Sequence, residues 1–304
     1  MSLTRGRFAP SPTGPIHLGT ARTALVAWLH ARSTKGAFIL RVEDLDTPRV
    51  RPGAREAMLE DLRWLGLDWD EGPDVGGPFG PYLQSERHAR YEAAIHALRA
   101  SGHLYPCTCS RKEIASIASA PHGEDGAVYP GLCRSGPTHP DRAPSLRFRL
   151  DRSEGFADGV HGAVSAGLGV GDFVVQRADG VFAYQLAVVV DDLAMGITDV
   201  VRGDDLLLST PRQIALTRAL GHEPLHYAHV PLVLGEDGER LAKRHGSIAL
   251  QTLRERHSSE QIVGVLAHSL GLQESDAPCS AASLIPRFSL SRFARVPFVW
   301  RVPS

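Results

Sequence analysis

The chain has little cysteine, almost no net charge and no long apolar run. Its 304 residues contain no stretch of about 18 apolar residues, so we expect no membrane-spanning helix and no membrane partner. The N-terminus lacks the long apolar segment of a secretory signal, and four cysteines are too few for a disulfide framework in so long a chain. Both features predict a reducing cytoplasm, where metal binding is the commoner use of clustered cysteines. A formal net charge of −1 means that any nucleic-acid surface must be local.

Short apolar runs alternate with helix-like apolar spacing in two separate parts of the chain. The N-terminal part predicts strand 3–9, helix 17–32, strand 38–42 and helix 52–65. The alternation returns after residue 184, with strand 198–202, helix 210–220 and strand 229–234. This order is typical of an α/β fold in which crossover helices join the strands of a parallel sheet.

The two α/β parts are separated by a segment of different character. It contains three of the cysteines and two strands that look antiparallel, at 145–150 and 172–177. We therefore predict an α/β domain made of residues 1–85 and 188–246, split by an insertion at 86–187. Helices near 248–255 and 259–270 predict a small helical C-terminal region at 247–304.

Two segments far apart in the chain could together hold a nucleoside triphosphate. The first consists of Arg7, Phe8, Ala9, Pro10, Ser11, Pro12, Thr13, Gly14, Pro15, Ile16, His17, Leu18, Gly19 and Thr20. The second consists of Arg240, Leu241, Ala242, Lys243 and Arg244. Residues 17–20 begin a helix after a strand, where unpaired backbone N–H groups favour phosphate, and Lys243 can stabilise charge on phosphorus. Alone, the first segment fits a turn and the second a solvated basic loop, so the prediction rests on the pair.

The same segments carry a resemblance to a known family. Residues 7–20 resemble the N-terminal signature of glutamyl-type class I aminoacyl-tRNA synthetases, with 17–20 at the HIGH motif and 240–244 at the KMSKS motif. Both motifs are degenerate, because Thr20 replaces the second histidine, Arg240 the first lysine and Ala242 the serine. Further matches follow in the family's order at 41–46, 72–78, 84–87 and 200–203, so the resemblance covers roughly residues 5 to 250.

The resemblance implies a Rossmann-type catalytic domain that activates L-glutamate with ATP and Mg²⁺. It implies that ATP binds His17, Gly19, Thr20 and Lys243, with His17 and Lys243 as the catalytic residues. The residues implied to bind glutamate are Arg7, Phe8, Ala9, Pro10, Ser11, Glu43, Tyr184 and Arg202. The chemistry agrees, because guanidinium groups recognise carboxylates and a carboxylate can hold an ammonium. Any one of these residues alone fits an ordinary surface pair or a core edge equally well.

Cys107, Cys109 and Cys133 lie close together in the predicted insertion. Three thiolates can bind Zn²⁺ at about 2.3 Å with one further ligand completing a tetrahedron, and the alternative is three cysteines without a ligand. Candidates for the fourth ligand are Tyr129, His122 and His103. A histidine is the usual choice, whereas the resemblance implies Tyr129. We expect one structural ion, because no acid–base partner is evident near the cysteines.

Three departures from the full-length enzymes resemble the glutamyl-Q branch of this family. Val188 stands where full-length glutamyl-tRNA synthetases typically have asparagine, the Cys/Tyr cluster follows the glutamyl-Q pattern, and no anticodon-binding domain is expected after the helical region. The branch implies transfer of glutamate to queuosine at the wobble position of tRNA(Asp), whose anticodon stem-loop would be the partner. We expect a monomer. Candidates for RNA contacts are Arg111, Lys112, Arg147 and Arg149.

Three other functions stay open from the residues alone. A short glutamyl-tRNA synthetase would charge tRNA(Glu) instead of modifying tRNA(Asp). A catalytically inactive paralogue would bind RNA without chemistry, although the presence of His17, Lys243 and Arg202 argues against it. An unrelated adenylate-forming ligase could use the same nucleotide-binding scaffold.

Overall fold

A six-stranded sheet forms the centre of the molecule. The computed structural model describes residues 3–110, 112–114, 128–165, 170–235, 249–293, 295 and 297–299. The strands lie in the order β2 (Ala37–Leu40), β1 (Arg5–Phe8), β8 (Asp199–Gly203), β9 (His226–Val230), β5 (Phe156–Asp158) and β6 (Gly162–Val164). The first five strands in this order run parallel, namely β2, β1, β8, β9 and β5. The last strand, β6, pairs antiparallel with β5. The predicted α/β fold with a parallel sheet is confirmed.

Helices cover both faces of this sheet. Alternate strand residues point to opposite sides, and apolar side chains on each side pack against helices. On one face, Leu40 and Val201 pack in the same core as α1 (Leu18–Ser33) and α2 (Ala54–Trp64). On the other face, Val200 and Tyr227 pack with Met195 and Ile214, which belong to the end of α5 (Tyr184–Ala194) and to α6 (Thr210–Ala219). Such burial on both faces explains why the strands read as short continuous apolar runs.

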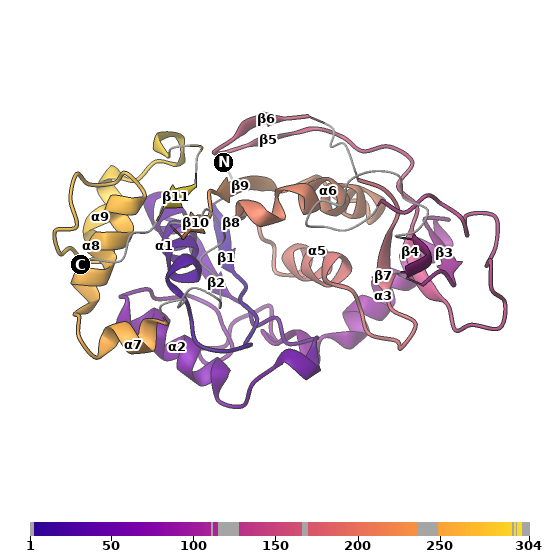
Figure 1. Cartoon of the computed structure of the whole chain (residues 1–304), viewed down its shortest axis with the longest axis horizontal. Coiled ribbons are helices and arrows are strands. Elements are labelled where there is room, and N and C mark those ends of the chain that lie inside the picture. Colours follow the sequence, from indigo (N-terminus) through magenta and orange to yellow (C-terminus); the bar gives the residue numbers. More distant parts are fainter. Residues whose placement is uncertain are drawn as a thin grey trace.

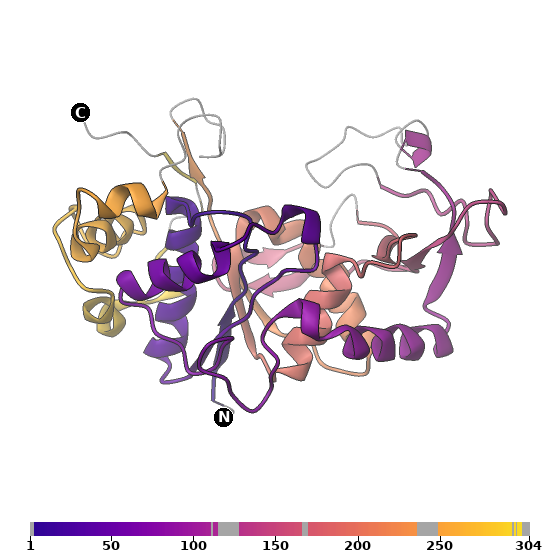
Figure 2. The same cartoon turned by 90° about the horizontal axis from the view of Figure 1, so that it is seen from below.

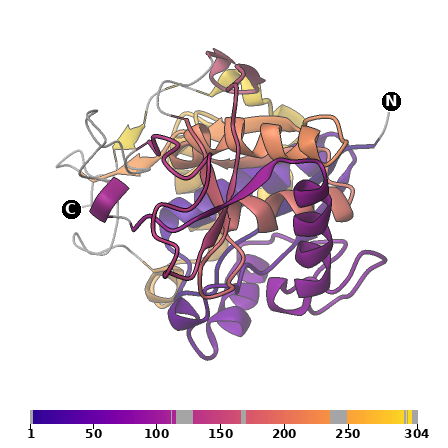
Figure 3. The same cartoon turned by 90° about the vertical axis from the view of Figure 1, so that its right-hand side faces the viewer.

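The segment predicted as an insertion begins with α3 (His88–Ala100) and forms its own antiparallel sheet. That sheet has the order β3 (Leu104–Cys107), β4 (Ser145–Phe148) and β7 (Phe173–Gln176), as expected from the sequence. It lies at one end of the elongated molecule, opposite the C-terminal helices (Figure 1). Figure 3 shows the molecule with this end toward the viewer. One shared apolar core joins α3, β4 and β7 to α5, so the insertion packs against the part of the chain that contains the central sheet.

One hairpin inside the insertion segment returns to the central sheet. Strands β5 and β6 lie between β4 and β7 in sequence, yet β5 pairs in parallel with β9 through Asp158 and Tyr227. The sequence analysis missed both strands, which are only three residues long each. The stretch 86–187 therefore contributes strands to two sheets. Its strands β5 and β6 complete the central six-stranded sheet.

The C-terminal region packs against α1 at the other end of the molecule (Figure 2). It contains α7 (Leu250–Arg254), α8 (Ser259–Ser269), α9 (Ala281–Leu284) and β11 (Phe298–Val299), which pairs with β10 (Val233–Leu234). Helix α8 begins at a capping box in which Ser258 and Gln261 satisfy each other's backbone N–H groups. The two helices predicted here are confirmed. In the part of the chain that the structure describes, no helix is long and apolar enough to cross a membrane.

Candidate functional site

A cavity of about 750 Å³ opens at the carboxyl ends of the central strands. Parallel strands bring their carboxyl ends to one edge of a sheet, where α/β proteins commonly bind ligands. Its lining includes every described residue that the sequence analysis assigned to glutamate and ATP, namely Arg7, Phe8, Ala9, Pro10, Ser11, His17, Gly19, Thr20, Glu43, Tyr184 and Arg202. Lys243 and the rest of the segment 240–244 lie outside the described residues.

Backbone hydrogen bonds hold the loop after β1 against the segment after β2. The Arg41 N–H donates to Phe8 O at 3.0 Å, and the Glu43 N–H donates to Pro10 O at 3.0 Å. Gly14 in this loop has a φ of 151°, which side-chain-bearing residues rarely adopt. These features set the loop at the cavity rim, directly before α1.

The N-terminus of α1 borders the cavity through His17, Gly19 and Thr20. His17 stands at the helix cap in extended conformation, and the first turn contains no acidic side chain. A side chain at Gly19 would meet no atom within 4 Å, so the neighbouring protein does not demand glycine there. An open glycine beside unpaired helix N–H groups leaves room for an anionic ligand to approach the backbone.

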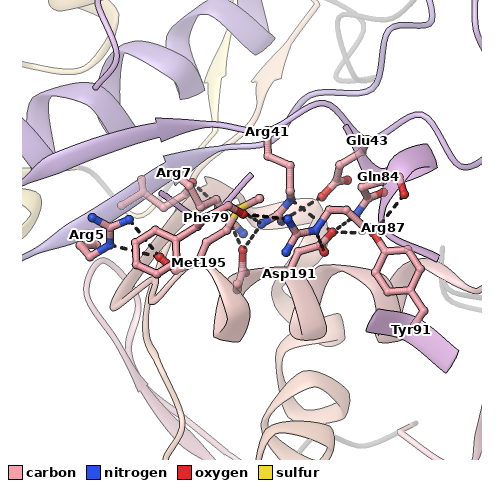
Figure 4. A network of polar contacts seen from close by, with 12 residues as sticks. Arg5, Arg7, Arg41, Glu43, Phe79, Gln84, Arg87, Tyr91, Asp191 and Met195 are labelled. Carbon is pink, nitrogen blue, oxygen red and sulfur yellow. Dashed lines mark hydrogen bonds and ion pairs between the residues drawn. The ribbon is translucent and has the colours of Figure 1, made fainter. Parts of the chain in front are cut away.

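Arg7 and Glu43 belong to a buried network of charges under the cavity (Figure 4). Arg7 Nε donates to Asp192 Oδ1 at 3.3 Å, and Arg41 Nη1 donates to the same oxygen at 2.6 Å. Burial raises the pKa of Asp192, but Arg7 and Arg41 outweigh it and lower the pKa below its ordinary value. Glu43 accepts from Arg41 Nη2 at 3.3 Å, and burial raises its pKa despite Arg41 and Arg7. A cationic group of a ligand that binds beside Glu43 would therefore lower its pKa and stabilise the ionised carboxylate.

Arg202 lines the cavity from β8 with its guanidinium almost completely buried. Its Nε lies 3.1 Å from His229 Nε2, and its Nη2 donates to Thr210 Oγ1 at 2.8 Å. Its Nη1 is buried and, among the described residues, has no hydrogen-bond partner. Because a buried donor without a partner is costly, this atom marks a place where an anionic ligand can bind.

Tyr184 and Val188 lie one turn apart on α5 but face different surroundings. Tyr184 begins the helix and lines the cavity, and burial raises the pKa of its hydroxyl. Val188 is 1% exposed and packs in the apolar core that α5 shares with α3 and β4. The polar contact that asparagine would offer at position 188 is therefore replaced by core packing.

A second cavity of about 770 Å³ extends from the first toward the insertion. Both cavities are lined by Ser11, Glu43, Arg49 and Tyr184. Three further arginines line the second one, Arg142, Arg147 and Arg177. The second cavity leads from the ends of the central strands to the cysteine cluster, and its lining contains four arginines and two carboxylates. Arg142 and Arg177 are also paired with Glu113 and Asp179.

The candidate RNA-contact residues are not all in this second cavity. Arg147 lines it, although its Nε lies 3.1 Å from Cys107 Sγ and its side chain is buried. Arg149 lines a separate cavity behind β4 and lies over the ring of Tyr105. Lys112 is exposed and lines neither the first nor the second cavity, and Arg111 lies outside the described residues.

The three clustered cysteines come together where β3 ends. The sulfur atoms of Cys107, Cys109 and Cys133 all lie within 4.8 Å of one another. Tyr129 Oη is 3.4 Å from Cys107 Sγ and 3.7 Å from Cys109 Sγ. Four ligands bonded to one ion at about 2.3 Å stand roughly 3.8 Å apart, so this donor set fits Zn²⁺. In the described ranges no histidine joins the group, and His122 lies outside them.

The surroundings favour the thiolate form of Cys133, whereas burial raises the pKa of Cys109. Burial raises the pKa of Cys133, but hydrogen bonds with Thr138, the Thr108 backbone and Tyr129 outweigh it and lower the pKa to about 5. His103 is directed elsewhere, because its Nδ1 lies 2.8 Å from Ser101 Oγ and its ring stacks on Phe148. Of the three candidates for the fourth ligand, the structure brings Tyr129 to the sulfur atoms.

Several buried polar residues of the site were missed by the sequence analysis. Arg41 and Asp192 tie Arg7 to Glu43, and Asp158 and His229 stand behind Arg202. Arg41 directly precedes Val42 and Glu43 in a stretch already matched to the family, which was an available signal. No sequence pattern marked Asp158, because its side-chain partner His229 lies 71 residues later in the chain.

Comparison with known proteins places this site in a family. Residues 4–276 match the model of the catalytic domain of class I tRNA synthetases (E and Q). A relative from Symbiobacterium thermophilum named glutamyl-Q tRNA(Asp) synthetase is 55% identical over 98% of this chain and 96% of its own. A relative of the same name from Deinococcus radiodurans is 50% identical over 92% of this chain and 95% of its own.

A solved structure agrees with these matches. The crystal structure of glutamate-tRNA synthetase from Elizabethkingia anophelis superposes with a TM-score of 0.84 at 29% identity. The match covers 99% of this chain and 68% of that protein. The chain therefore belongs to the class I tRNA synthetases (E and Q), in the family of the glutamyl-Q tRNA(Asp) synthetases.

Proposed function

We propose that this chain activates L-glutamate with ATP and transfers the glutamate to queuosine at the wobble position of tRNA(Asp). One observation carries the proposal above the others. A single cavity brings together Arg7 and Arg202, the Glu43 carboxylate and the N-terminus of α1, which match the charges of glutamate and of a nucleotide phosphate. The names of the relatives support the choice of RNA, since they are glutamyl-Q tRNA(Asp) synthetases.

In the proposed complex, Arg202 binds the side-chain carboxylate of glutamate through its unpaired Nη1, with Arg7 beside it. Glu43 holds the ammonium group, and the added positive charge favours the ionised form of Glu43. Ser11 and Tyr184 supply directional hydrogen bonds. Only the α-carboxylate is then left free to react.

Activation follows from positioning and charge stabilisation. The α-carboxylate attacks the α-phosphorus of ATP in line, glutamyl-adenylate forms, and pyrophosphate leaves. We assign the phosphates to His17, Gly19 and Thr20 at the start of α1. Lys243 is kept from the sequence-based prediction as the side chain that stabilises charge on the phosphates. Mg²⁺ bound to the phosphates supplies further neutralising charge. No protein nucleophile takes part.

The second cavity is the proposed entry for the anticodon stem-loop. Its arginines suit a phosphate backbone, and it meets the first cavity at Ser11, Glu43, Arg49 and Tyr184. A hydroxyl of the queuosine diol would there attack the carbonyl carbon of the adenylate, with AMP as the leaving group. We keep the sequence-based division into 1–85 with 188–246, 86–187 and 247–304, with β5 and β6 completing the catalytic sheet.

We assign one structural Zn²⁺ to Cys107, Cys109, Tyr129 and Cys133. Their mutual distances and the absence of a fourth cysteine or histidine in the described part of the cluster support this set. The ion would fix the end of β3 beside the second cavity. A reducing cytoplasm suits this role, because it keeps the thiols free of disulfides. We also propose that the protein acts as a monomer.

The direct test is glutamate-dependent exchange between ATP and labelled pyrophosphate without RNA. The account expects exchange with L-glutamate, and no exchange after Lys243→Ala, because charge on the phosphates is then unpaired. The matched control is Lys35→Ala, a lysine distant from the lining of the cavity. Exchange that survives in Lys243→Ala at the wild-type rate would remove Lys243 from the mechanism. A wild-type protein without exchange would refute the enzyme assignment.

A further inference from the structure

A buried histidine and aspartate stand directly behind Arg202. His229 on β9 is the register partner of Arg202 on β8, and its side chain is fully buried. Its Nε2 lies 3.1 Å from Arg202 Nε, and its Nδ1 lies 2.6 Å from Asp158 Oδ2. The three side chains therefore form a chain from β5 through β9 to β8.

Asp158 can act only as an acceptor in this arrangement. Its Oδ1 accepts from the backbone N–H groups of Val160 and His161 at 2.9 Å each. The backbone N–H of His229 also donates to this oxygen at 3.3 Å. Burial raises the pKa of Asp158, but these bonds and His229 outweigh it and lower the pKa. The remaining oxygen of the carboxylate faces His229 Nδ1, which must carry the proton.

The other ring nitrogen of His229 is then an acceptor. Arginine Nε always carries a proton, so Arg202 donates and His229 Nε2 accepts. Burial is the main reason that the pKa of His229 falls to about 4, and the nearby charge of Arg202 lowers it further. His229 is therefore neutral near pH 7, and Asp158 and Arg202 select the same tautomer. Thr210 Oγ1 also lies 3.1 Å from Nε2, where its hydroxyl can donate to the same accepting nitrogen.

These contacts fix the plane of the Arg202 guanidinium. Nε is used by His229 and Nη2 by Thr210 Oγ1 and Leu206 O, at 2.8 and 3.3 Å. The ring of Tyr227 stacks on the ring of His229 with an interplanar angle of 10°. The Arg202 guanidinium lies over the Tyr227 ring. The one nitrogen left without a partner in the described structure is Nη1, on a residue that lines the cavity.

We propose that Asp158 and His229 are positioning residues that aim Arg202 at the side-chain carboxylate of glutamate. This inference rests on the proposed function, because it needs Arg202 to bind that carboxylate. Asp158 orients the histidine, the histidine orients the guanidinium, and neither residue touches the substrate. The β5–β6 hairpin thereby links the insertion segment to amino-acid recognition.

The kinetic test compares four variants in glutamate-dependent pyrophosphate exchange. His229→Leu removes the acceptor, and Asp158→Asn allows the opposite tautomer, whose Nε2–H would oppose Arg202 Nε–H. We expect each to raise the KM for glutamate about tenfold or more, the loss of roughly one hydrogen bond to a charged group, while kcat and the KM for ATP change less than about twofold. His229→Gln restores an acceptor and should stay within about threefold of the wild type. The control His226→Gln changes an exposed histidine on the same strand.

Three results would overturn the proposal. One is an unchanged glutamate KM in His229→Leu and Asp158→Asn. Another is an equal rise in both KM values together with a fall in kcat, which indicates general disorder of the site. The third is a His229→Gln protein as impaired as His229→Leu, which would exclude the acceptor role.

A second measurement does not depend on activity and reports on the wild-type protein, with a variant used only to assign one signal. Nitrogen-15 NMR of the wild-type imidazoles, with His229 identified among the 14 histidines by its loss in His229→Gln, reports which ring nitrogen carries the proton. We expect Nδ1–H and a bare Nε2 throughout pH 6 to 8. An Nε2–H tautomer or an imidazolium ion overturns the positioning role. Absence of exchange in the wild type would instead refute the proposed function, so the two failures are distinguishable.

Discussion

At the scale of single residues, the floor of the site is made of buried charges that compensate one another. Arg41 has no exposed surface, and its three acidic neighbours are Asp192 at 2.6 Å, Glu43 at 3.3 Å and Asp191 at 3.7 Å. A buried charge without a partner costs several kcal/mol, so each of these side chains requires the others. The charged groups beneath the cavity are therefore shielded from water and held in place before a ligand binds.

The buried His229 gives a residue-scale prediction about pH. Its pKa is about 4 in the folded protein against an ordinary 6.5, mainly because of burial. Between these values the unfolded chain binds a proton that the folded chain does not, so stability falls as the pH falls from 6.5 toward 4. We expect the wild type to lose about 1 kcal/mol more than His229→Gln per pH unit in this window. Urea unfolding at pH 7, 6 and 5 measures the difference.

The comparison with His229→Gln isolates this histidine. Other groups titrate in both proteins, and Asp158, with a pKa below its ordinary 3.8, changes charge outside the window. Unfolding free energies that decline in parallel for the two proteins would show that His229 is not held neutral by the fold.

The residues predicted from sequence are those that stand at strand ends or in short motifs. Arg7, Glu43 and Arg202 were predicted because strand ends and family motifs coincide there, and all three line one cavity. Their supporting partners were missed, since a buried ion pair leaves no periodic signal and joins residues far apart in the chain. Tyr129 was implied as the fourth ligand by the resemblance, and its distances to the sulfur atoms support it over His103. The ligand set and Lys243 stay predictions.

At the scale of elements, helix α5 is tied to the start of the insertion by a single buried carboxylate. Asp191 accepts from Arg87 Nε at 2.5 Å, from Gln84 Nε2 at 2.8 Å and from Tyr91 Oη at 2.9 Å. Three hydrogen bonds on one fully buried group fix how α5 and α3 lie relative to each other (Figure 4). Because Tyr184 stands on the first turn of α5, this tie also sets the wall of the cavity.

We expect Asp191→Asn to destabilise the fold by about 3 to 5 kcal/mol, because it leaves the buried Arg87 without its counter-charge, while Arg41 keeps Asp192 and Glu43. The matched control is Asp179→Asn, an exposed turn aspartate that pairs with Arg177. That change should cost less than about 1 kcal/mol. Chemical denaturation at pH 7 measures both, and equal effects would contradict the role given to Asp191.

The cysteine cluster gives a second prediction at this scale. We expect the purified protein to contain one zinc ion per chain and Cys133→Ala to lose it, because three remaining ligands hold zinc poorly. Thermal unfolding of Cys133→Ala should begin at a lower temperature than that of the wild type. Cys279→Ala is the control, since Cys279 lies outside the cluster. Metal analysis decides the matter, and zinc retained in Cys133→Ala would refute the ligand set.

Elements with strong periodicity were predicted well, and short ones were not. Helix α1 and the strands β1, β2 and β8 follow from apolar spacing, with ends shifted by a few residues. The single strand predicted at 229–234 instead covers the end of β9 and the short strand β10. Helix α2 begins at Ala54 rather than Pro52, because Gly53 takes a φ of 74° at its cap. The β5–β6 hairpin was missed because its partner β9 lies about 70 residues later, and alternation within a strand does not identify its neighbour.

At the scale of the whole molecule, two cavities meet above the central sheet. The first is bounded by strand ends and α1, and the second runs along the insertion past Arg142 and Arg177. The ends of the central strands border the first cavity, and the insertion contributes arginines to the second. In the proposed function, glutamate occupies the first cavity and the RNA enters through the second, so that the two substrates meet where the cavities join.

The central claim is the identity of the RNA that receives glutamate. It is tested by incubating the protein with ATP and labelled glutamate together with three purified RNAs in parallel. These are tRNA(Asp) containing queuosine, tRNA(Asp) lacking it, and tRNA(Glu). The account predicts that only the first becomes labelled. Labelling of tRNA(Glu) alone would contradict it and would identify a short enzyme that charges tRNA(Glu).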